Sequence, residues 1–127
     1  MQPRYSEFLC PKFQTALDVL ARPWNGLVMA VLFQFGPLRF SELRKHLSAM
    51  GDRVLAARLK ELEARQLIVR RVEPGPPVRV AYELSETGRG FRDVVLALAE
   101  WGDRIIKSRP AKPRPISKRV KRKRSPR

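Results

Sequence analysis

The feature that most constrains the fold is a leucine repeat in the middle of the chain. Leu55, Leu59 and Leu62 are four and then three positions apart, which places their side chains on one stripe of an α-helix. Asp52 can cap the first turn of that helix. The pattern therefore predicts an amphipathic helix over residues 52–66, with its leucine face buried.

The face of this helix opposite the leucines carries small and basic side chains. Small side chains let a helix backbone approach another surface closely, while Arg and Lys bind phosphates or base edges. The alternative is an ordinary amphipathic surface helix. The residues concerned are Arg53, Ala56, Ala57, Lys60 and Glu61, with Val54 and Arg58 on the flank.

Shorter segments precede the leucine helix. The pattern predicts a helix over 10–21, a mostly buried helix over 24–34, an extended piece over 38–40 and a short helix from Ser41, as its cap, to residue 47. A turn then joins this short helix to the leucine helix. Helix, tight turn and helix in this order are typical of a helix-turn-helix.

Two strands follow, over residues 67–73 and 78–84, on either side of a Pro-Gly-Pro-Pro turn. They form a hairpin, which in this position is a wing. A last helix, capped by Ser85, is predicted over 86–107. We therefore predict an α+β fold, mostly α: a winged helix-turn-helix with a two-stranded wing and terminal dimerisation helices.

The last helix has more apolar surface than a small core can cover. Its apolar residues form a heptad-like stripe, which a matching helix from a second chain would bury. We therefore predict a homodimer. The stripe consists of Phe91, Val94, Val95, Leu98, Trp101 and Ile105.

The charge balance favours a polyanionic partner. The formal net charge is +15, and ten of the 27 basic residues lie in residues 108–127, which contain no acid. Such a balance most often indicates nucleic acid and less often an anionic membrane surface. We divide the chain into an N-terminal arm (1–9), a winged helix-turn-helix domain (10–107) and a basic disordered tail (108–127).

Several function classes find no support. The single cysteine excludes an internal disulfide framework, and the apolar stretches are too short to cross a bilayer, so we expect a cytoplasmic protein with no membrane partner. His46 has no second histidine or acidic cluster at ligand spacing. No nucleophilic triad, phosphate-binding glycine loop or pair of buried acids is evident, so we expect neither an enzyme nor a metal or cofactor.

A series of motifs over residues 10–105 resembles the HxlR-type regulators, a branch of the MarR-like winged-helix proteins. The chain departs from the family pattern at Pro23, Gln66 and Val69, and the basic tail is not part of that pattern. The motifs are Cys10-Pro11, Trp24, Gly36-Pro37-Leu38-Arg39-Phe40-Ser41-Glu42-Leu43, Arg58-Leu59-Lys60-Glu61-Leu62, Pro76-Pro77-Val78-Arg79-Val80-Ala81-Tyr82, Leu84-Ser85-Glu86-Thr87-Gly88 and Ala99-Glu100-Trp101-Gly102.

The resemblance implies a homodimeric bacterial transcription regulator, associated with the nucleoid, whose dimer forms through its first and last helices. Phe13 and Leu17 of the first helix then join the interface. Several members of the family sense electrophiles, oxidants or aldehydes through the cysteine that Cys10 matches. Cys10 begins a helix beside Lys12, and both features favour the reactive thiolate. The alternative is an inert, half-buried cysteine, and an aromatic pocket between the long helices is a second possible effector site.

The resemblance assigns reading of the major groove to the leucine helix. Arg53 and Arg58 are candidates for guanine, Ala56 or Ala57 for a thymine methyl group, and the other basic and hydroxyl residues for phosphates. The alternative for each basic residue is a solvated surface charge. The predicted set is Arg39, Ser41, Arg44, Arg53, Val54, Ala57, Arg58, Lys60, Arg71 and Arg79.

We therefore expect a sequence-specific regulator that binds an inverted repeat in double-stranded DNA as a homodimer, with a small electrophile or another small molecule as effector. One alternative is an architectural, nucleoid-type protein whose tail binds DNA without sequence preference. Another is an RNA-binding protein that depends on the tail. Truncation after Lys107 distinguishes them, because only the first retains sequence-selective DNA binding without the tail.

Overall fold

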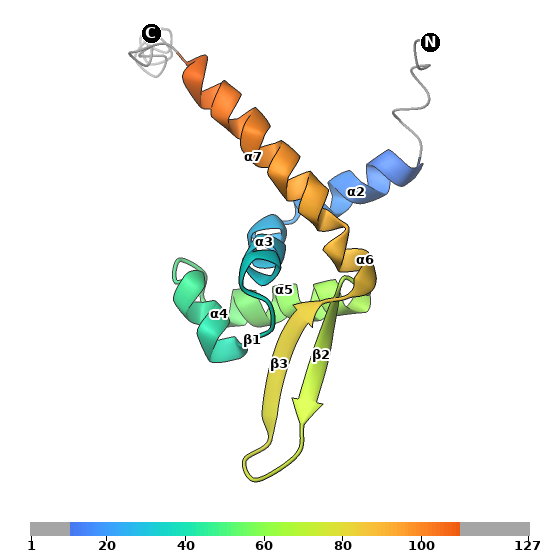
Figure 1. Ribbon diagram of the computed structural model, residues 1–127, viewed down its shortest axis with the longest axis vertical. Helices are drawn as coiled ribbons and strands as arrows, with labels where there is room; N and C mark the ends of the chain where they lie inside the picture. The colour runs from blue at the N-terminus through green and yellow to red at the C-terminus, as the bar shows by residue number, and fades with distance from the viewer. Residues whose placement is uncertain (1–10, 110–127) are drawn as a thin grey trace, which may run out of the picture. The chain divides into compact units, whose positions relative to one another are not determined.

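The computed structural model describes residues 11–109, and its elements follow the predicted order (Figure 1). Helix α4, the following turn and α5 form the helix-turn-helix, and β2 and β3 form the wing, so the winged helix-turn-helix prediction is confirmed. The elements are α2 (Pro11–Ala21), α3 (Asn25–Phe35), β1 (Leu38–Arg39), α4 (Phe40–His46), α5 (Asp52–Ala64), β2 (Ile68–Glu73), β3 (Arg79–Leu84), α6 (Glu86–Arg89) and α7 (Phe91–Lys107).

The core lies among α3, α5 and the base of the wing, within the first of two compact units that divide after Val95. The three leucines of α5 are buried, as the spacing predicts. Asn25, at the start of α3, is also buried, and its side-chain amide donates a hydrogen bond of 2.9 Å to the carbonyl of Val19 in α2. The other core residues are Val28, Met29, Leu32, Leu43, Leu47, Met50, Ile68, Leu84 and Phe91.

The sheet has three antiparallel strands rather than the two of the predicted hairpin. Its order is β1-β3-β2, because the short extended piece before α4 pairs with β3. Tyr82 at the centre of β3 lies opposite Leu38 of β1 and Arg70 of β2. This pairing fixes the wing to the start of the helix-turn-helix.

The last helix is interrupted, which corrects the prediction of one continuous helix. Ser85 does cap it, since its hydroxyl accepts a hydrogen bond of 3.0 Å from the Gly88 amide. Helix α6, however, ends at Arg89, and α7 begins after Gly90. The apolar stripe begins only at Phe91, and Gly88 and Gly90 before it were the sign of a break in the sequence.

The start of α4 also differs from the prediction. Arg39, and not Ser41, occupies the position before the first helical residue. Its backbone N–H donates a hydrogen bond of 2.8 Å to the Glu42 carboxylate, and this bond satisfies a donor that the helix itself leaves unpaired. Ser41 lies exposed in the first turn.

Helix α5 ends in a Schellman motif built on a left-handed residue. The Leu67 amide donates to the Leu62 carbonyl and the Gln66 amide to that of Glu63, both at 2.9 Å. Gln66 has φ 63°, a conformation that suits glycine far better than a residue with a Cβ.

Gln66→Gly should therefore stabilise the fold by about 1 kcal/mol, because it relieves the left-handed strain at the end of α5. Thermal unfolding should show a rise in Tm of roughly 4 °C. The matched control is Gln14→Gly, in the exposed middle of α2, where the same change should cost roughly 0.5–1 kcal/mol. A fall in Tm for Gln66→Gly would contradict the expected strain.

Helices α2 and α7 leave most of their apolar side chains exposed. Helix α2 buries none of its residues, and its Phe13 and Leu17 side chains are 45% and 46% exposed. In α7, Phe91 is the one buried residue, while Trp101 is 60% exposed. Val94, Leu98 and Ile105 of the predicted stripe are also exposed, and Val95 is partly buried.

No single helix among residues 11–109 has the length and apolar content needed to cross a membrane. The pair α2 and α3 meets these criteria by length and composition when the two are counted together, across a bend of 88°.

Candidate DNA-binding surface

Helix α5 presents the small, basic face that its sequence predicts. Arg53, Ala57 and Lys60 are exposed, on the side of the helix away from the three buried leucines. Val54 on the flank is also exposed. The two successive alanines, Ala56 and Ala57, leave room for another surface to approach the backbone between the two cations.

A groove of about 500 Å³ separates this face from the wing. Ala56, Ala57 and Lys60 form its α5 side, and Arg70 and Tyr82 form its wing side. These two wing residues are not in the set predicted from the sequence. Strand alternation carried the signal, because Arg70 is two positions from the buried Ile68 and so shares its face of the sheet.

The predicted wing residues lie on the other face of the sheet. Arg71 and Arg79 alternate with Arg70 and Tyr82, so their side chains leave the opposite face from the groove. Arg71 is also ion-paired with Glu83. Arg39 lies opposite Ala81 and shares that outer face. Arg71 and Arg79 therefore lie outside the groove beside α5.

Arg58, a predicted candidate for a base contact, is mostly covered and ion-paired within α5. Its side chain is 17% exposed, and its Nη1 lies 3.1 Å from a Glu61 carboxylate oxygen. The other Glu61 oxygen lies 3.3 Å from Nε of Arg65 and 3.6 Å from Nε of Arg22, which precedes α3. One carboxylate is thus ion-paired with three guanidinium groups, and Arg58 helps to neutralise the charge of Glu61 within α5.

Helix α4 gathers a second group of polar side chains. Ser41, Arg44 and Lys45 line a hollow of about 250 Å³ with Ser48 of the following turn. Arg44 is ion-paired with Asp52 at the start of α5, and both side chains remain more than half exposed. The predicted phosphate contacts Ser41 and Arg44 therefore lie together, and Arg44 also ties the two helices of the motif.

The described residues contain no group of three His, Cys, Asp or Glu side chains that could hold a metal ion. His46 is exposed at the end of α4, where its ring stacks on Phe35 with centroids 4.2 Å apart. Cys10, the predicted sensor, lies outside the described residues, as does the tail from residue 110 onwards.

Comparison with known proteins gives the family. Residues 19–110 match the HxlR-like helix-turn-helix family. The HTH-type transcriptional regulator YodB of Bacillus subtilis is 38% identical over 97 residues, which are 76% of this chain and 86% of YodB.

Solved structures agree with this match. Reduced YodB from B. subtilis has a TM-score of 0.69 and 39% identity, over 74% of this chain and 91% of that one. The redox regulator HypR in its reduced form has a TM-score of 0.70 and 32% identity, over 77% of this chain and 99% of that one. YodB has also been solved with quinone bound and after diamide treatment. The chain thus belongs to the HxlR-like helix-turn-helix family and is a DNA-binding transcriptional regulator of the HxlR type.

Proposed function

We propose that the protein is a homodimer that binds an inverted-repeat operator through two copies of α5. The observation that carries this proposal is the combination of an exposed small, basic face on α5 with apolar faces on α2 and α7 that the protomer leaves uncovered. A pair of recognition helices about 34 Å apart would read two half-sites one turn of DNA apart.

Within this proposal Arg53 reads a base edge, since it lies in the first turn of α5, where recognition helices contact bases. Ala57 contacts a thymine methyl group, and Val54 lines the same approach. Lys60, Ser41, Arg44 and Arg70 bind phosphates. The groove between α5 and the wing supports this division, because Lys60 and Arg70 both line it, against one acid, Glu63.

The dimer uses the exposed stripes of the terminal helices. Phe13 and Leu17 of α2 join Val94, Val95, Leu98, Trp101 and Ile105 of α7. Phe91, predicted for the same interface, is 9% exposed and packs in the protomer's own core, so it is left out. The polar side of α7 is held by pairs such as Lys107 Nζ with Asp103, at 3.1 Å.

Arg53→Ala should lower the preference of the protein for its operator over a scrambled duplex by roughly 5- to 150-fold. Loss of a bidentate contact with guanine costs about 1–3 kcal/mol of discrimination. Footprinting of the intergenic DNA next to the gene for this protein locates the operator. Fluorescence anisotropy then measures the affinities for the operator and for the scrambled duplex at fixed salt.

Two controls belong to this experiment. Arg58→Ala should leave the sequence preference intact, because Glu61 already holds that side chain. Lys60→Ala should weaken binding to both duplexes alike and reduce the salt dependence by about one counterion. An unchanged operator preference in Arg53→Ala would overturn the assignment of the reading residue.

We further propose that Cys10 makes DNA binding sensitive to electrophiles or oxidants. Support comes from the Lys12 neighbour in the sequence and from YodB, a relative that has been solved with quinone bound. Benzoquinone or diamide should weaken operator binding of the native protein at least tenfold, and Cys10→Ser should abolish the response. A full response in Cys10→Ser would refute this role, because the chain has no other cysteine.

A further inference from the structure

We propose that Asp52, the first residue of α5, accepts a hydrogen bond from an amino group on the edge of a DNA base, and that Arg44 of α4 holds it in position. This inference rests on the proposed function, because it assigns a further specificity-determining residue to the same recognition helix. It adds a different chemistry, since the base contact is made by an acid and not by a cation.

Asp52 lies where a recognition helix reaches base edges. It is the acid in the first turn of α5, next to Arg53, and the N-terminal residues of recognition helices contact bases. It precedes Ala56 by four positions and so lies about 40° round the helix from it, at the edge of the small, basic face. Its side chain is 61% exposed, so the carboxylate is accessible to a base.

The Asp52 carboxylate is not used as the helix cap. Gly51 occupies the N-cap position of α5, and no side chain caps the helix there. Within residues 11–109 the one cation paired with Asp52 is Arg44, whose Nε lies 2.5 Å from Oδ1 of the carboxylate. An ionised carboxylate accepts hydrogen bonds through both of its oxygens. The second oxygen, Oδ2, is therefore left for another donor.

Arg44 can hold Asp52 and a DNA phosphate at the same time. A guanidinium group carries five N–H donors, and the ion pair with Asp52 uses the one on Nε. Arg44 also lines the hollow of about 250 Å³ on α4, together with Ser41, Lys45 and Ser48. These four residues are spaced by three, one and three positions, so they share one side of α4 and of the turn after it. A phosphate bound in this hollow would fix Arg44, and Arg44 would in turn fix Asp52.

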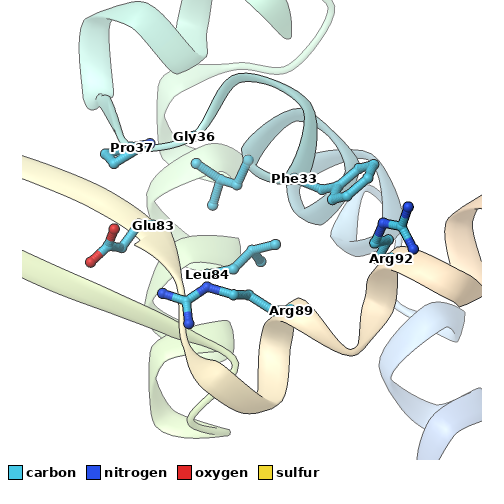
Figure 2. A pocket seen from close by; sticks show the side chains of 8 residues that line it. Phe33, Gly36, Pro37, Glu83, Leu84, Arg89 and Arg92 are labelled. Carbon is cyan, nitrogen blue, oxygen red and sulfur yellow. The ribbon is translucent and has the colours of Figure 1, made fainter.

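The shared direction of these side chains distinguishes them from other exposed cations. Arg89 and Arg92 line the hollow between α3 and the end of β3, and Figure 2 shows their guanidinium groups at opposite ends of it. Groups placed in this way do not converge on one phosphate. On α4, by contrast, two cations and two hydroxyl groups line a single hollow.

The ion pair also makes an acid acceptable at a DNA surface. The DNA backbone is densely negative, so an unpaired carboxylate beside it would be repelled. The pair of Arg44 and Asp52 has no net charge, and the carboxylate still accepts hydrogen bonds. Arg44 therefore allows Asp52 to approach the base edges without a general loss of affinity.

A carboxylate discriminates among bases because it can only accept hydrogen bonds. In the major groove the N4 amino group of cytosine and the N6 amino group of adenine are donors, whereas O6 of guanine and O4 of thymine are acceptors. Asp52 should therefore favour cytosine or adenine on the strand that it faces. Guanine or thymine at the same position would oppose two acceptors and should be rejected.

The test is selection of duplexes from a library with randomised positions, using the full chain, followed by sequencing. The native protein should select an inverted repeat in which one position of each half-site is cytosine or adenine. Asp52→Ala should reduce the preference at that position by roughly 5- to 150-fold and keep the preferences elsewhere. Fluorescence anisotropy measures this change on duplexes that differ only at that position. Arg44→Gln should reduce the same preference and also weaken binding to all duplexes.

Asp93→Ala is the matched control. Asp93 is likewise an exposed acid in the first turn of a helix, α7, and it too is paired with an arginine, at 3.5 Å from Arg92. Its replacement removes the same charge outside the recognition helix, so the selected sequence should not change.

Four results would overturn the proposal. Preferences that stay the same at every position in Asp52→Ala would show that Asp52 reads no base. A uniform gain in affinity for all duplexes would show simple repulsion between Asp52 and phosphates. A uniform loss, together with a lower Tm, would make Asp52 a structural tie between α4 and α5. A native protein that selects no sequence would overturn the proposed function as well, which distinguishes that failure from the other three.

Discussion

Trp101→Glu should convert the protein into monomers and lower its operator affinity a hundredfold or more. The Trp101 side chain is 60% exposed in the protomer, so its replacement should not disturb the fold. In the proposed dimer the same side chain is buried against the partner helix, where an unpaired charge is costly.

The loss in affinity follows from the loss of one half-site. In a dimer the second recognition helix binds as an intramolecular event, which raises overall affinity by about 10²–10⁴ without any new contact. Sedimentation velocity measures the mass of the particle, and fluorescence anisotropy measures operator binding over the same concentration range.

Leu96→Glu is the matched control. Leu96 is 52% exposed in the same helix, and at 100° per residue it lies about halfway round from the stripe that contains Trp101. Leu96→Glu should remain dimeric and retain operator affinity. A dimeric Trp101→Glu protein with native affinity would refute the proposed interface, and so would an equal defect in the two variants.

Gly88→Ala should destabilise the fold by about 3 kcal/mol or more. A Cβ at this position would overlap the carbonyl oxygen of Leu67 and lie 3.3 Å from Cδ2 of Leu84. The Leu67 carbonyl is held in place, because it accepts a hydrogen bond of 3.0 Å from the Ser85 amide. The clash would involve the backbone of both segments, so neither α6 nor the Leu67 carbonyl can shift without a large energetic cost.

Urea denaturation of the two proteins would measure this cost as a lower midpoint at an unchanged slope. Gly51→Ala, at the N-cap of α5, is the control: a Cβ there meets nothing within 4 Å, and the change should cost less than about 1 kcal/mol. A midpoint for Gly88→Ala close to that of the native protein would show that α6 can move away from Leu67.

The sequence predicted those elements whose signal is local and periodic. The leucines of α5 are buried because their spacing leaves one continuous apolar stripe, and Ser85 caps α6 because its hydroxyl reaches the Gly88 amide. The pairing of β1 with β3 was missed, since a two-residue strand has no period to detect. The break at Gly90 was missed because the prediction joined the Ser85 cap directly to the apolar stripe that begins at Phe91, although two glycines lie between them.

The site was predicted less completely than the fold, for a physical reason. Charge in the sequence does not show which cations are free. Arg58 is held by Glu61 three positions later, and Arg71 is held by Glu83 across the sheet. Arg70 lines the groove through strand alternation, which the sequence does contain. Arg53 and Lys60 have no ion pair in the described part of the chain and keep their proposed roles.

The three arginines on Glu61 have a mechanical consequence. Arg58 and Arg65 belong to α5 itself, but Arg22 belongs to the connection between α2 and α3, and its side chain is 58% exposed. An exposed ion pair contributes less than about 1 kcal/mol. The Arg22 side chain can therefore leave Glu61 at little energetic cost, and the Glu61 carboxylate keeps two cations of α5 as partners when it does.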